Sequence, residues 1–194
     1  MEKALLEKEF ELSEVEAEKQ VKSNDAKLIQ TLKELKQRCR GYKGLFYELV
    51  KPINPQYDIA VKVSLQKCLK FLVVNSAKDA QTVSDFLTEK QLQMELLVLE
   101  NLPEQVPNPM LPKLPKDTVL VYQVIEVPRS EPLIDKAVKY FTGAKVFCKS
   151  FAEAKRLQKE LQLKDIVTED GTQFRHGMIS GGNQPNIFKL QLGT

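Results

Sequence analysis

The sequence predicts an α/β (α+β) fold made of two pseudo-duplicated halves and preceded by a long N-terminal helix. Three observations support this prediction. The first forty residues contain no Gly or Pro and are crowded with strong helix formers. Beyond them, a strand–helix–strand–helix–strand pattern occurs twice. A proline-dense stretch that holds five of the chain's ten prolines separates the two passes. No residue-level repeat is evident between the halves.

Residues 1–40 are predicted to form a coiled-coil arm. Val21, Leu28, Leu32, Leu35 and Cys39 step by 7, 4, 3 and 4 residues, which is the spacing of an a/d seam. The alternative is an amphipathic helix packed on its own domain. Glycines at 41 and 44 are expected to end this helix, because glycine adopts the positive φ of a helix C-cap.

Residues 41–100 are interpreted as the first subdomain, with apolar runs bounded by turn residues and one helix carrying Ile59, Ala60, Val63 and Cys68 on a single face. The expected elements are a strand over Leu45–Val50, a helix over Tyr57–Lys67, a strand over Leu69–Asn75, a helix over Ala77–Lys90 and a strand over Glu95–Leu99.

A proline-rich linker over 101–117 leads to the second subdomain, residues 118–182. Residues 183–194 are poor coiled coil and are interpreted as a tail or the start of a return arm. The elements expected in the second subdomain are a strand over Val119–Val127, a helix over Pro132–Phe141, a strand over Ala144–Cys148, a helix over Ser150–Leu161 with Ser150 as its N-cap, and a strand over Asp165–Thr168.

Composition excludes several classes of protein. The chain has 194 residues, 42% of them hydrophobic and 28% charged, but no run of eighteen uncharged apolar residues, so no membrane span is expected. Its acidic N-terminus does not resemble a signal peptide, and a soluble intracellular protein is expected. Three unpatterned cysteines and the single His176 provide no metal-ligand spacing. Without a P-loop or nucleophile elbow, we expect no catalytic residue and no cofactor, and a small α/β enzyme is the weakest alternative.

A glycine-rich segment near the end of the second subdomain is the most informative motif. Asp170-Gly171 precedes it and predicts a hairpin turn. Small residues around one short apolar pair allow close backbone approach, so we predict a structural role here, either as a turn or as a close-packed interface. An anion-binding nest is the alternative. The predicted interface residues are Gly177, Met178, Ile179, Ser180, Gly181 and Gly182.

A basic run lies at the end of the N-terminal helix. DNA contact is one interpretation, since clustered cations bind phosphate. The alternative is that the cations stabilise the helix C-terminus and keep the chain in solution. The residues are Lys33, Lys36, Arg38, Arg40 and Lys43.

Taken together, these motifs resemble the hinge domain of SMC (structural maintenance of chromosomes) proteins over about residues 41–182. The matching elements are Gly41 and Gly44, Tyr57 to Val61, Val73-Val74 and Val167 to Gly182. Leu49 to Pro52 and Gly171 to Phe174 are most similar to the first SMC subunit of cohesin, with condensin and other SMC complexes as alternatives.

The resemblance implies a non-catalytic module that pairs with another SMC hinge as a doughnut-shaped dimer, subdomain to opposite subdomain. A heterodimer is expected and a homodimer is the alternative. The full-length protein would be a chromosome-organising ATPase of the nucleus, acting in sister chromatid cohesion and chromosome segregation, and DNA is a possible further partner.

Overall fold

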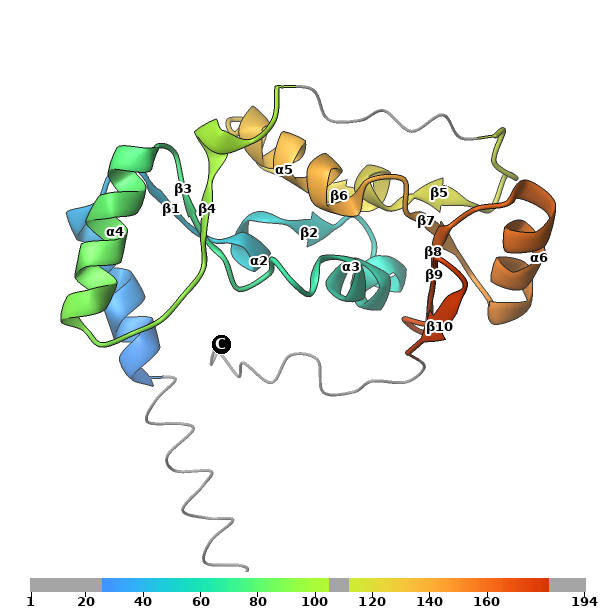
Figure 1. The fold of residues 1–194 in the computed structure, drawn as a ribbon, viewed down its shortest axis with the longest axis horizontal. Helices are drawn as coiled ribbons and strands as arrows, with labels where there is room; N and C mark the ends of the chain where they lie inside the picture. The colour runs from blue at the N-terminus through green and yellow to red at the C-terminus, as the bar shows by residue number, and fades with distance from the viewer. Residues whose placement is uncertain (1–25, 105–111, 182–194) are drawn as a thin grey trace, which may run out of the picture.

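The structure is a computed structural model that describes residues 26–104 and 112–181. Its mixed helices and strands confirm the predicted fold class. The elements form layers that follow one another along the longest axis of the molecule (Figure 1). The predicted coiled coil before residue 26, Gly182 and the tail over 183–194 lie outside the described residues.

The first sheet has the strand order β1-β3-β4, formed by β1 (Tyr42–Leu45), β3 (Leu72–Val74) and β4 (Leu96–Val98). β1 is antiparallel to β3, and β4 is parallel to β3. Parallel neighbours need a crossover connection, which here contains α4 (Ala77–Glu89).

The second sheet has the order β10-β9-β8-β7-β5. β5 (Val119–Leu120) is antiparallel to β7 (Val146–Cys148), and β7 is parallel to β8 (Asp165–Thr168) across α6 (Phe151–Leu161). This arrangement repeats that of the first sheet. A hairpin of β9 (Gln173–Arg175) and β10 (Met178–Ser180) then extends the second sheet beyond β8.

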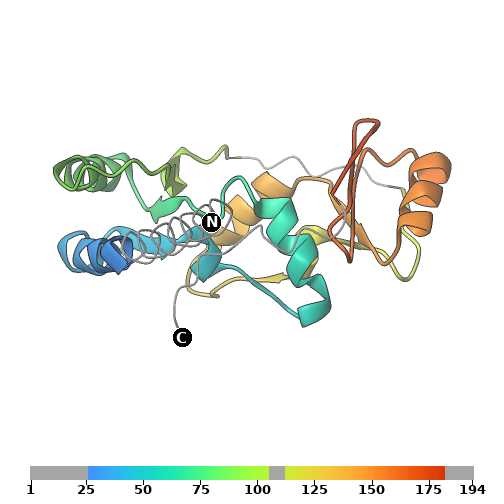
Figure 2. The ribbon, with the colours of Figure 1, turned by 90° about the horizontal axis from the view of Figure 1, so that it is seen from below.

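A central layer lies between the two sheets and joins the halves (Figures 1 and 2). Its short strands β2 and β6 pair antiparallel, with Lys51 opposite Glu126 and Pro52 opposite Ile125. The layer consists of α2 (Phe46–Leu49), β2 (Lys51–Pro52), η1 (Pro55–Tyr57), α3 (Asp58–Leu65), η2 (Leu99–Asn101), η3 (Val121–Val124), β6 (Ile125–Glu126) and α5 (Pro132–Thr142).

Alternation along the strands divides the interior into three hydrophobic cores. In β3, Leu72 and Val74 face α4, whereas Val73 faces the central core. In β7, Val146 and Cys148 face α6, whereas Phe147 faces the central core. Both sheets are therefore covered on their outer faces by a crossover helix, and both bury their inner faces in one core shared by the two halves.

The structure reveals a residue-level repeat that inspection of the sequence missed. Asp58 and Lys62 on α3 form an ion pair of 2.7 Å, and Asp135 and Lys139 on α5 form one of 2.6 Å. In each helix a buried Ala-Val dipeptide lies between the two charged residues. These dipeptides are Ala60-Val61 in α3 and Ala137-Val138 in α5. The crossover helices α4 and α6 also both begin after a serine N-cap that accepts a hydrogen bond from the N3 amide.

Two predicted strands were wrong because local caps interrupt them. The predicted strand Leu45–Val50 is the helical turn α2, stabilised where the Leu45 amide donates to the Glu48 carboxylate at 3.1 Å. The predicted strand Val119–Val127 is interrupted by η3, where the Leu120 amide donates to Gln123. Ile59, expected on the buried face of its helix, is 48% exposed.

The N-terminal helix is described from residue 26 and ends at residue 38. Its seam residues Leu35 and Cys39 are buried against Val83 and Phe86 of α4. Figure 2 shows the two helices side by side at one end of the molecule. Over residues 26–38, this helix therefore packs on its own domain.

Candidate dimerisation interface

β10 is an edge strand with apolar side chains exposed on both of its faces. Met178 is 66% exposed and Ile179 is 53% exposed. Consecutive residues of a strand point to opposite sides, so these two side chains lie on opposite faces of β10. Only β9 pairs with β10 among the described residues. An edge strand of this kind is a template for pairing with a strand from another chain.

The turn that precedes β10 explains why residue 177 is a glycine. His176 has φ +46° and Gly177 has φ +85°, the two positive values that a tight type I′ hairpin turn requires. A Cβ on Gly177 would meet no heavy atom within 4 Å. Gly177 is therefore required by the backbone of the hairpin itself.

Gly181 also serves its own chain. Its φ is +98°, and a Cβ there would lie 2.7 Å from the Gly171 carbonyl oxygen. The close backbone approach predicted between two subunits thus occurs within one subunit, between the end of β10 and the β8–β9 turn. Met178 and Ile179 are the residues of β10 that offer exposed apolar side chains to a partner.

The β8–β9 turn that supports Gly181 is fixed by side-chain hydrogen bonds. Asp170 accepts one from the Thr168 hydroxyl, one from the Thr172 amide at 3.1 Å and one from the Thr172 hydroxyl at 3.2 Å. These bonds, that from Thr168 foremost, lower the pKa of Asp170. The predicted Asp-Gly turn is confirmed, and Gly171 has the required positive φ of +85°.

A second unpaired edge lies on the first sheet. Strands β1-β3-β4 correspond to β5-β7-β8, but the second sheet continues beyond β8 with two further strands. Among the described residues, no strand occupies the equivalent place beside β4. A groove opens where β4 begins, lined by Lys70, Gln93, Met94 and Glu95. This edge could not be predicted from sequence, because a three-residue strand of Leu96-Leu97-Val98 has the same pattern at the centre and at the edge of a sheet.

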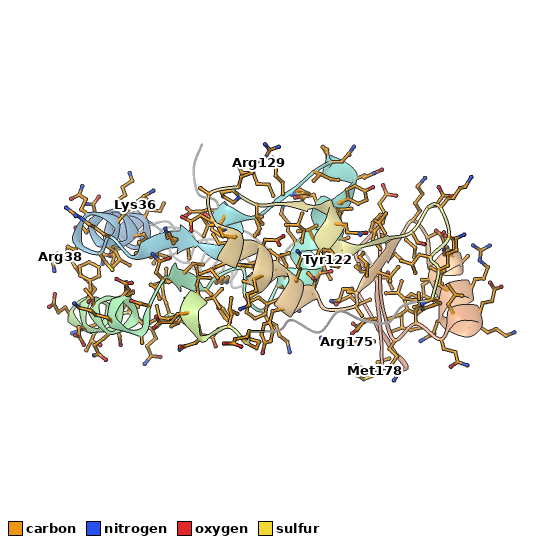
Figure 3. The ribbon with its side chains drawn as sticks, turned by 90° about the horizontal axis from the view of Figure 1, so that it is seen from above. Lys36, Arg38, Tyr122, Arg129, Arg175 and Met178 are labelled. Carbon is orange, nitrogen blue, oxygen red and sulfur yellow. The ribbon has the colours of Figure 1, made fainter. Side chains whose placement is uncertain are left out.

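The basic run lies at the other end of the molecule, and its residues differ in whether they have an acidic partner within the chain. Arg38 pairs with Glu89 at 3.5 Å and lies over the Phe86 ring. Lys43 donates to Glu131 at 2.6 Å. Lys33, Lys36 and Arg40 are exposed. Lys36 and Arg38 lie at the end of the molecule far from Met178 (Figure 3). Two of the five cations therefore already have acidic partners within the chain.

Comparison with known proteins identifies the family. The family described as "SMC proteins Flexible Hinge Domain" matches residues 39–158, more than half of the chain. This chain belongs to the SMC hinge family. Hinge domains of SMC proteins are not catalytic.

Relatives of this hinge domain have low sequence identity. Structural maintenance of chromosomes protein 1 of Arabidopsis thaliana is 28% identical over 180 residues, which are 92% of this chain and 14% of the relative. The chain thus spans about a seventh of that protein. None of the helices in residues 26–104 and 112–181 has the length and hydropathy of a transmembrane span.

Two solved structures share the fold of this hinge domain. The SMC hinge domain of Pyrococcus furiosus aligns with a TM-score of 0.59 at 25% identity, over 83% of this chain and 87% of that one. A structure titled "Folded elbow of cohesin" aligns with a TM-score of 0.73 at 24% identity, over 88% of this chain and 25% of that one.

Proposed function

We propose that this hinge domain pairs with the hinge of a second SMC subunit by adding β10 of one subunit to the bare edge of β4 in the other. The observation that carries the proposal is the exposure of Met178 and Ile179 on an edge strand. Main-chain hydrogen bonds would join the sheets, and the two apolar side chains would be covered. Repeated at both ends, this exchange would produce a closed dimer, subdomain to opposite subdomain.

The internal duplication supports β4 as the receiving edge. In the second sheet, β8 is the equivalent of β4, and β9 lies antiparallel beside it. When the pairing of β3 with β4 is compared with that of β7 with β8, Glu95, just before β4, corresponds to Asp165 at the start of β8. A strand added antiparallel to β4 would therefore repeat in the first sheet a geometry that the same chain already uses in the second.

Ile59 would extend the apolar contact. It is 48% exposed on α3, and a Cβ built on Gly171 would lie 2.8 Å from its Cγ2 atom. Gly181 lies against the same turn, so Ile59 and the end of β10 are neighbours across the β8–β9 turn. Burial of this side chain in the dimer is part of the proposal.

The resemblance to cohesin supports a proposal for the subclass of this protein. The relative in Arabidopsis thaliana is an SMC protein 1, and the structure with a TM-score of 0.73 carries cohesin in its title. We propose that the complete protein is the first SMC subunit of a cohesin-like ATPase of nuclear chromosomes. Its hinge would then form a heterodimer, and its functions would be sister chromatid cohesion and chromosome segregation.

Sedimentation equilibrium with a charged variant of β10 tests the pairing. We expect Met178→Asp/Ile179→Asp to abolish association with a second SMC hinge, because two carboxylates would be buried without partners. Ile53→Asp is the matched control, since Ile53 is 57% exposed but lies beside β2. Gly181→Glu is a poor test, because its side chain would disturb the fold of its own hairpin. Unchanged association of the β10 variant would refute the proposal.

Hydrogen exchange tests the receiving edge. On mixing the two hinges, amides in a peptide covering 93–99 should become protected, while those of a peptide covering 26–38 should not. If the pair is a heterodimer, this protection should appear when the second hinge is added. It should not appear when this chain alone is concentrated. Protection confined to β10, with none at β4, would show that another edge receives the strand.

A further inference from the structure

The bare edge of β4 offers one carboxylate next to two leucines. Leu96 packs against the second core on the side of α4, and Leu97 packs against the central core. Glu95 precedes them, is exposed and lines the groove at the start of β4. Its backbone carbonyl accepts the Leu72 amide at 2.9 Å, so its main chain already belongs to the sheet. None of the six ion pairs found among the described residues includes Glu95.

The second sheet has the same arrangement with its edge already occupied by β9. Asp165, the counterpart of Glu95, lies opposite Arg175, whose Nε atom is 3.4 Å from Asp165 Oδ1. The next residue of β8 is Ile166, which lies opposite Phe174. An occupied edge thus has a polar partner opposite the carboxylate and an apolar side chain opposite the residue that follows.

The two faces of β10 also differ in polarity. Ile179 lies opposite Phe174 and therefore points to the side of α6. Ser180 lies opposite Gln173 and points to the inner side of the sheet. In a closed dimer the inner faces of both sheets stay buried in their central cores, so α4 and α6 both remain outside. Ile179 of one subunit must then point to the α4 side of the sheet that receives it.

One register of β10 beside β4 matches polar residues with polar residues. When Ile179 lies beside Leu96 of the receiving subunit, Ser180 lies beside Glu95, and the remaining apolar residues of the two strands face each other. A shift of two residues in either direction keeps the same faces. It places the carboxylate or the hydroxyl beside an apolar side chain, however, and a buried polar group without a partner is costly.

Hydrogen bonds within the hairpin leave the Ser180 hydroxyl suited to donate outward. The buried Lys145 ammonium donates to Gln173 Oε1 at 3.3 Å, so the amide nitrogen of Gln173 remains as a donor. Ser180 is the residue directly opposite Gln173. A hydroxyl that accepts from Gln173 still has its own hydrogen to donate. The carboxylate of Glu95 in the neighbouring subunit would accept it.

We infer that Glu95 sets the register of pairing and selects the partner by requiring a hydrogen-bond donor opposite it on the added strand. The inference rests on the proposed addition of β10 to β4. A hydroxyl or a cation at the partner position that aligns with Ser180 satisfies the carboxylate. An acid at that position is rejected, because two like charges would be covered together. The partner is therefore an SMC hinge whose edge strand has two apolar residues followed by a donor.

A charge swap between two hinges tests this selection. The probe is an SMC protein 3 hinge, a subclass with a relative 26% identical to this chain over 146 residues, with serine, lysine or aspartate placed in turn at the position aligned with Ser180. We expect lysine to strengthen association with the unmodified chain about threefold relative to serine. Aspartate should weaken it about tenfold or more. Glu95→Lys should reverse this order, and Glu95→Gln should bring the three affinities close together. Sedimentation equilibrium measures each affinity.

Glu104→Lys is the matched control, because it makes the same change of charge at an exposed position outside β4. It should leave the affinity for each of the three probes within about twofold of that of the unmodified chain. The same order of affinities with Glu95→Lys as with the unmodified chain would overturn the inference. A reversed order with Glu104→Lys would do so too, since it would show an effect of net charge alone.

Disulfide trapping measures the register directly. Glu95→Cys should cross-link under mild oxidation to a cysteine at the probe position aligned with Ser180, because opposite residues of antiparallel strands have neighbouring Cβ atoms. Gln93→Cys and Leu97→Cys, which correspond to the two shifted registers, should not. The native cysteines of the chain are buried and should stay reduced. Cross-linking at position 93 or 97 without cross-linking at 95 would contradict the register.

The outcomes separate this inference from the proposed pairing. No association of any probe, or association that Met178→Asp/Ile179→Asp leaves unchanged, would refute the pairing and the inference with it. Association that this β10 variant abolishes, but that does not depend on the charge at residue 95, would refute the inference alone.

Discussion

Gly41 and Asp79 lie so close that a Cβ on Gly41 would overlap the Asp79 carboxyl group. That carboxylate accepts hydrogen bonds from the Ser76 amide at 3.2 Å and the Ser76 hydroxyl at 2.6 Å, and it also faces the Cys39 thiol. One acidic side chain therefore caps α4 and contacts the chain just after the N-terminal helix. This contact joins the start of α4 to the residues that follow the N-terminal helix.

Gly41→Ala should destabilise the domain, because the alanine methyl group can be accommodated only by moving Asp79 off its cap. We expect a loss of about 1–3 kcal/mol in the free energy of unfolding, measured with urea. In an Asp79→Ala background the same substitution should cost much less, which a double-mutant cycle would detect. Equal costs in both backgrounds would show that the two residues are not coupled.

The two serine caps should contribute unequally to stability. Ser76→Ala removes the acceptor of the Asp79 amide and the donor to its carboxylate, whereas Ser150→Ala removes only the acceptor of the Glu153 amide. We expect losses of about 1–2 kcal/mol for the first and about 1 kcal/mol for the second, measured by thermal unfolding. Ser84→Ala, on the exposed face of α4, is the control and should stay within about 0.5 kcal/mol. A larger effect at Ser150 would contradict this order.

Crossover helices and buried strands were predictable from sequence because local signals agreed there. α4 and α6 have apolar residues at helical spacing and serines at their N-caps, and both were placed within one residue of their observed starts. The buried runs of β3 and β8 were equally clear. In the central layer the helices α3 and α5 were predicted, but α2 and η3 were not, because these apolar turns depend on a cap by Glu48 or Gln123 and on β2–β6 pairing.

The candidate interface was only partly predictable. Glycine spacing identified the hairpin before β10, but not the approach of Gly181 to Gly171, which depends on tertiary structure. Pairing of Arg38 with Glu89, 51 residues away, was likewise invisible in the sequence.

A buried lysine makes stability dependent on alkaline pH. Lys145 is 4% exposed, its ammonium group donates to Gln173 at 3.3 Å, and burial lowers its pKa from 10.5 to about 8. Asp165 and Cys68 oppose this shift, whereas Arg175 and Lys67 favour it. Since the unfolded chain then binds more protons between pH 8 and 10.5, this residue makes stability rise with pH across that window.

Lys145→Met tests the sign of this effect. Below pH 8 the variant should match or exceed the stability of the unmodified chain, because no ammonium group is buried. Between pH 8 and 10.5 the unmodified chain should gain up to roughly 3 kcal/mol relative to the variant. Burial raises the pKa values of Cys68 and Cys148 to about 12, and both thiols act in the opposite sense above pH 9. Cys148 does so equally in both proteins, whereas Lys145→Met also removes a charge that lowers the pKa of Cys68. Urea unfolding at several pH values measures the difference, and a difference that falls with pH would contradict the assignment.

The shared central core should make the two halves unfold together. Phe46 of the first half is fully buried and meets Phe141 of the second half edge-to-face at 5.8 Å. Phe46→Ala should therefore lower the free energy of unfolding by about 3–5 kcal/mol and shift a single transition for the whole domain. Circular dichroism reports helices from both halves, and hydrogen exchange distinguishes β3 from β8. If β3 lost protection at lower urea than β8, the halves would be separate folding units, and the core between them would be only a contact surface.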